Sequence, residues 1–85
     1  MKTIYHVYAL DDSLEFFFDT EGKLLHWWSQ NDATYNAEQM NPLFKAMGVK
    51  VEEAEPNDDR FKQCLKEFLL EYGYQEDDVE YLIGE

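Results

Sequence analysis

The sequence predicts an α+β domain: a three-stranded antiparallel meander followed by a helix, a short strand, a long amphipathic helix and a short C-terminal element. Two observations predict it. Near the N-terminus, three runs of β-branched and aromatic residues alternate with short polar breaks. Later in the chain, apolar residues recur at helical spacing. The chain has 85 residues, of which 16% are aromatic, so we expect residues 1–85 to fold as a single compact acidic domain.

The predicted strands span residues 3–10, 14–18 and 24–29. Gly22 can adopt a positive φ in the turn between the last two, which therefore form a hairpin. The first strand is apolar on both faces, which a central position in the sheet would explain, although its alternation does not settle the point. We expect helices to cover one face of this sheet.

Residues 37–47 have helical spacing, but Pro42 interrupts the pattern. A proline inside a helix removes a hydrogen bond and clashes with the preceding turn. We therefore expect the helix to begin with Asn41 as N-cap and Pro42 as the first helical residue, and to end at Gly48. A short strand over residues 49–53 follows.

Residues 58–72 form the clearest predicted helix, capped by Asn57 or Asp58 and ended by Gly73. Its apolar residues make one continuous stripe, which consists of Phe61, Cys64, Leu65, Phe68, Leu69 and Tyr72.

The last segment fits either a strand or a short helix. Alternate apolar residues from Val79 to Ile83 suit a strand, whereas Val79, Leu82 and Ile83 also share one helical face. The acidic residues before them favour a helix, with Asp77 or Asp78 as its cap, because the dipole stabilises negative charge at a helix N-terminus.

The chain carries 19 acidic and 7 basic residues, a net charge of −12. Small soluble domains need a net charge of only about 2–8 in magnitude. The charge disfavours nucleic acids and anionic membranes as direct partners and favours a basic protein. Two acidic clusters would supply the field for such a partner: Glu52, Glu53, Glu55, Asp58 and Asp59 in the first, and Glu76, Asp77, Asp78 and Glu80 in the second. Residues 67–85 hold seven acidic residues and no Lys or Arg.

No motif for catalysis or for a cofactor is present. The four glycines are isolated, which excludes a glycine-rich phosphate loop. Cys64 falls on the apolar stripe, so we expect a buried, unreactive thiol. His6 and His26 lack the spacing of metal ligands, and we expect them to pack or to bond locally. We expect no metal, no cofactor and no enzymatic activity.

The single cysteine excludes an internal disulfide, and the sequence holds no apolar run of membrane-spanning length and no signal-peptide pattern at its start. We therefore expect a cytoplasmic protein.

Trp27 and Trp28 are consecutive in the third predicted strand, so they point to opposite faces of the sheet. If helices cover one face only, one Trp joins a Phe from residues 16–18 in an exposed aromatic patch, a feature typical of binding hot spots. Alternatively, both faces are covered, or the chain dimerises through this one.

These features favour a small inhibitor or adaptor that binds a basic surface of another protein, in particular the nucleic-acid site of a nuclease or DNA-binding protein. The acidic clusters would replace phosphates, and Trp27 or Trp28 would supply apolar anchoring. Toxin immunity proteins and phage proteins that block restriction or CRISPR systems are comparable in size and charge, although no motif links them to this chain. The alternative is a self-associating module or subunit that uses the aromatic sheet face, with acidity serving solubility alone.

Overall fold

The computed structural model describes residues 2–10, 13–30 and 35–84. Its strands are β1 (Lys2–Tyr8), β2 (Leu14–Phe18), β3 (Leu24–Ser29) and β4 (Val49–Ala54), and its helices are α1 (Ala37–Ala46), α2 (Lys62–Tyr72) and α3 (Glu76–Ile83). The α+β class, the meander and the order of elements that the sequence predicts are confirmed. The first strand ends two residues earlier than expected, at Tyr8.

The four strands form one mixed sheet in the order β3-β2-β1-β4. The meander pairs are antiparallel, whereas β4 joins the far side of β1 in parallel. The central position suggested for the first strand is therefore confirmed, and it explains why β1 buries apolar residues on both faces.

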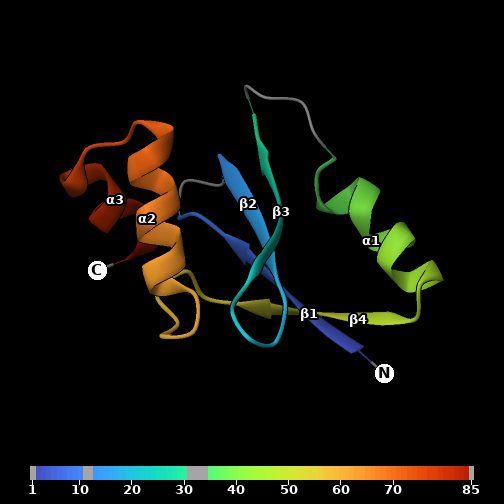
Figure 1. Cartoon of the computed structure of the whole chain (residues 1–85). Coiled ribbons are helices and arrows are strands. Elements are labelled where there is room, and N and C mark those ends of the chain that lie inside the picture. Colours follow the sequence, from blue (N-terminus) through green and yellow to red (C-terminus); the bar gives the residue numbers. More distant parts are fainter. Residues whose placement is uncertain (1, 11–12, 31–34, 85) are drawn as a thin grey trace.

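Helices cover both faces of this sheet. Figure 1 shows α2 and α3 on one side and α1 on the other. The expectation of a single covered face is wrong, because the chain must cross from β3 at one edge to β4 at the opposite edge, and α1 lies within that crossover. All five residues of β2 are buried, as two covered faces require.

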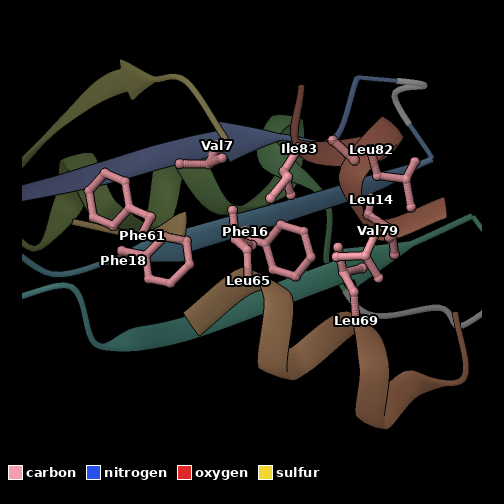
Figure 2. Packing of buried hydrophobic residues seen from close by; sticks show 11 residues of the cluster. Val7, Leu14, Phe16, Phe18, Phe61, Leu65, Leu69, Val79, Leu82 and Ile83 are labelled. Carbon is pink, nitrogen blue, oxygen red and sulfur yellow. The ribbon is translucent and has the colours of Figure 1, made fainter. Parts of the chain in front are cut away.

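The larger core lies between the sheet and the pair α2 and α3 (Figure 2). Phe18 stacks on Phe61 with ring centroids 4.7 Å apart, and Phe16 meets Phe68 edge-on at 5.2 Å. Burying each large apolar side chain contributes about 1.5–3 kcal/mol, so this cluster holds both helices on the sheet.

The smaller core lies under α1, where Phe44 packs on Phe17 with ring centroids 5.3 Å apart. Contrary to expectation, α1 begins at Ala37 with Asn36 as N-cap, and it contains Pro42 in its interior. Asn36 and Gln39 form a reciprocal capping box, with both hydrogen bonds at 3.1 Å. This cap and the burial of Phe44 outweigh the cost of the proline.

The start of α2 also differs from expectation. Asp58 caps a turn ahead of α2: its Oδ1 accepts a hydrogen bond from the amide of Arg60, and its carbonyl accepts from Phe61 and Lys62. The N-cap position itself is Phe61.

The final segment is a helix, the alternative that the acidic residues favoured.

The N-cap of α3 is Gln75, so Asp77 and Asp78 lie in the first turn instead of serving as caps. Within the three described ranges, no helix is long and apolar enough to cross a membrane.

Candidate functional site

The second acidic cluster covers the solvent side of α3. Glu76, Asp77, Asp78 and Glu80 are all exposed, whereas Val79, Leu82 and Ile83 on the other side of the helix are buried in the larger core. Three of the four acids occupy the first turn, where the helix dipole stabilises negative charge. The element therefore presents carboxylates from a backbone that the core holds in place.

The first acidic cluster is partly neutralised by the chain's own cations. Three ion pairs do this: Lys50–Glu52 at 2.9 Å, Arg60–Asp58 at 3.1 Å and Lys62–Asp59 at 3.6 Å. The hydrogen bonds from Arg60 lower the pKa of Asp58, and the hydrogen bond to Glu52 raises the pKa of Lys50. Arg60 and Lys62 pair at the turn that Asp58 caps, whereas Lys50 and Glu52 are two residues apart within β4.

Glu53 and Glu55 differ from the other members of this cluster. Both are exposed, and neither forms an ion pair with a Lys or Arg among the residues that the structure describes. Glu53 accepts a hydrogen bond of 2.9 Å from Nδ1 of His6, its neighbour across the β1–β4 register. The structure thus separates an internally paired part of this cluster from an outward-facing part.

His6 belongs to a buried polar network that was not expected from the sequence. The ring is 1% exposed and stacks on Phe17 with centroids 4.7 Å apart. Its Nε2 lies 3.7 Å from Oε2 of Glu15, too far for a hydrogen bond, and has no partner among the described residues. The signal for this network was Glu15 itself, a single acid within an otherwise apolar strand.

His26 and Cys64 have local roles. His26 Nε2 lies 2.7 Å from the carbonyl oxygen of Tyr35. Cys64 is half-buried on α2, and burial, followed by the charge of Glu67, raises the pKa of its thiol. Among the described residues, no three His, Cys, Asp or Glu side chains are arranged to hold a metal ion.

The two tryptophans lie on opposite faces, but neither belongs to an open aromatic surface. Trp27 meets Phe68 and Tyr72 of α2 edge-on, with centroids 5.1 and 5.6 Å apart. Trp28 is half-buried on the other face, and Phe17 on that face is completely buried beneath α1. The expectation of a Trp–Phe patch on an uncovered face is therefore wrong.

Comparison with known proteins gives no match: no protein-family model, no curated protein and no solved structure is significantly similar to the chain.

Proposed function

We propose that this chain is a small acidic binding protein that attaches to a basic surface of a protein partner and blocks the nucleic-acid site of a nuclease or DNA-binding protein. One observation carries the proposal. The acidic side of α3 presents four exposed carboxylates within five residues, on a helix anchored in the core. We expect the protein to act in the cytoplasm.

A basic groove that binds nucleic acid contacts phosphates through Lys and Arg side chains. Carboxylates on a helix whose backbone the core already holds can take the place of phosphates without the entropic cost of ordering that backbone. The first turn of α3 and the exposed residues Glu53 and Glu55 are the parts of the two clusters that suit this role, because Glu52, Asp58 and Asp59 pair within the chain.

Long-range attraction would speed the encounter with such a partner. Residues 67–85 contribute a charge of −7 with no compensating Lys or Arg. Neutralising acids in this region should therefore slow association more than it speeds dissociation.

The test is affinity capture of the tagged protein's partners from host lysate, with elution by stepped salt and identification by mass spectrometry. The wild type is compared with Asp77→Asn/Asp78→Asn and with a control, Glu21→Gln/Glu38→Gln, which removes the same charge from exposed sites outside both clusters. We expect one basic nucleic-acid-binding protein, released at moderate salt and displaced by added duplex DNA. The Asp77/Asp78 variant should release it at lower salt than the control does.

Two results would contradict the proposal. Equal behaviour of the two variants would mean that α3 has no special role. Recovery of the protein alone at every salt concentration would indicate self-association, the alternative in which acidity serves solubility alone. Comparison of Trp27→Ala and Trp28→Ala would then show whether the half-buried tryptophans support that association.

A further inference from the structure

The topology of the sheet creates a groove at the carboxyl ends of β1 and β4. These parallel strands remain paired as far as Val7 and Ala54. Beyond that point they separate: the amide of Leu10 donates to the carbonyl of Leu82 on α3, whereas the chain after β4 turns toward α2 through a hydrogen bond from the Asp58 amide to the Glu55 carbonyl. Two parallel strands whose continuations diverge leave a crevice, as at the strand ends of open α/β sheets.

The groove has a volume of about 200 Å³ and is lined by Tyr8, Ala9, Leu10, Glu53, Ala54, Glu55 and Pro56. Small-molecule sites usually have volumes of about 300–1,000 Å³. The size therefore suits a single inserted side chain better than a cofactor or metabolite.

The lining combines apolar surface with negative charge. Tyr8 and Leu10 are 37% and 53% exposed, and Ala54 and Pro56 add apolar surface. Among the described residues that line the groove, the charged ones, Glu53 and Glu55, are both acidic. A long aliphatic stem that ends in a cation matches both properties, because Lys and Arg bury their methylene groups while the charged head binds carboxylates.

Glu53 is held in place from inside the protein. The ionised carboxylate can only accept, so Nδ1 of His6 donates the 2.9 Å hydrogen bond to Oε1. The His6 ring is itself fixed by stacking on Phe17 and by an edge contact to Tyr8 at 4.2 Å. The Glu53 side chain nevertheless remains 71% exposed, so it is positioned without being enclosed.

We propose that this groove receives a lysine or arginine side chain of the basic protein partner. The inference rests on the proposed function and assigns it a specific docking point. Charge selects this occupant: an anionic ligand would face two carboxylates, and a second copy of the chain would bring its own net charge of −12.

The test is an NMR titration of the ¹⁵N-labelled protein with acetyl-Gly-Arg-Gly-amide. The matched probe replaces arginine by citrulline, which keeps the shape and removes the charge. We expect saturable shifts for the amides of residues 8–10, 53–55 and 57 with the arginine peptide alone.

The Glu53→Gln/Glu55→Gln variant should bind the arginine peptide about tenfold more weakly, since it loses charge-assisted hydrogen bonds. A glutamine at position 53 retains an oxygen that can accept from His6, so the fold is preserved. The Glu21→Gln/Glu38→Gln variant, with the same change in net charge, should bind like the wild type.

The proposal is overturned if citrulline shifts the same amides equally, if arginine shifts the α3 amides instead, or if the Glu53/Glu55 variant binds unchanged. If the NMR titration fails but affinity capture still depends on Asp77 and Asp78, only the proposed role of the groove is rejected. If the arginine peptide binds saturably but affinity capture fails, the proposed function is rejected and the role of the groove as a site for a cationic side chain is kept.

Discussion

At the scale of single residues, Glu15 shows how one acid can join separate elements. It lies in β2, is 8% exposed, and accepts a 2.8 Å hydrogen bond from the amide of Ala37, the first residue of α1. The first amides of a helix have no partner within it. Glu15 therefore satisfies a buried donor and favours one docking position for α1.

The first prediction concerns this contact. Glu15→Ala leaves the Ala37 amide buried without an acceptor and should lower the free energy of unfolding by about 1–3 kcal/mol. Glu15→Gln keeps a side-chain oxygen and should cost less than Glu15→Ala. Urea unfolding at pH 7 measures both values. Equal losses for the two variants would mean that the carboxylate charge, not the hydrogen bond, is what matters.

At the scale of elements, α1 is where local sequence preference and tertiary packing conflict. Pro42 falls at its sixth position, where an ordinary residue would donate to the carbonyl of Glu38. The helix nevertheless starts at Ala37, because the Asn36–Gln39 capping box and Glu15 satisfy its first amides.

The second prediction follows from that geometry. Pro42 is exposed, so Pro42→Ala removes no core packing and restores one hydrogen bond. It should raise the free energy of unfolding by about 1–3 kcal/mol. The control Asn41→Ala, also at an exposed position, changes only helix propensity and should gain about 0.7 kcal/mol at most. Denaturant unfolding measures both variants. If Pro42→Ala does not raise the free energy of unfolding, the helix begins at Pro42 and not at Ala37.

At the scale of the whole molecule, repulsion among the excess negative charges opposes the compact state. The molecule measures 38 × 27 × 18 Å, so at about 0.01 M salt, where the Debye length is roughly 30 Å, most of its charges interact. Among the described residues, the exposed ion pairs Lys50–Glu52, Arg60–Asp58 and Lys62–Asp59 are each worth about 0–1 kcal/mol, while the chain has a net charge of −12. Repulsion should therefore dominate the effect of salt on stability.

The third prediction is that raising NaCl from about 0.01 to 0.5 M at pH 7 stabilises the protein. Screening repulsion worth about 1 kcal/mol would raise the midpoint of thermal unfolding by about 4–8 °C. Calorimetry measures the midpoint, and Asp77→Asn/Asp78→Asn should respond less than the wild type. A midpoint that falls with salt would show that the ion pairs outweigh the repulsion.

Local chemistry explains what could be predicted. The strands of the meander and the helix containing Leu65 and Leu69 follow from the periodicity of apolar residues and from the polar breaks and glycines between them. These signals act over a few residues. For the last segment, the helical alternative places Asp77 and Asp78 away from Val79 and Leu82, and the structure shows this helix with both acids exposed.

Long-range pairing explains what could not be predicted. The ion pair between Arg60 and Asp58 requires a particular turn, and the bond between His6 and Glu53 joins residues 47 positions apart. A periodic pattern within one element does not indicate which distant residue will be the partner. The aromatic patch that one of the two tryptophans was expected to form is absent among the described residues for the same reason, since the position of α1 depends on the strand order.

By itself, then, the sequence determined the α+β class, the sequential order of the elements, the net charge and the place of the acidic clusters along the chain, since these depend on composition and on spacing within single elements. It left the last segment open between a strand and a helix. Only the tertiary structure decided that β4 joins β1 in parallel, that both sheet faces are covered, and that Glu53 and Glu55 flank a groove. The physical reason is that residues far apart in the chain choose their partners by burying apolar surface and satisfying hydrogen bonds together.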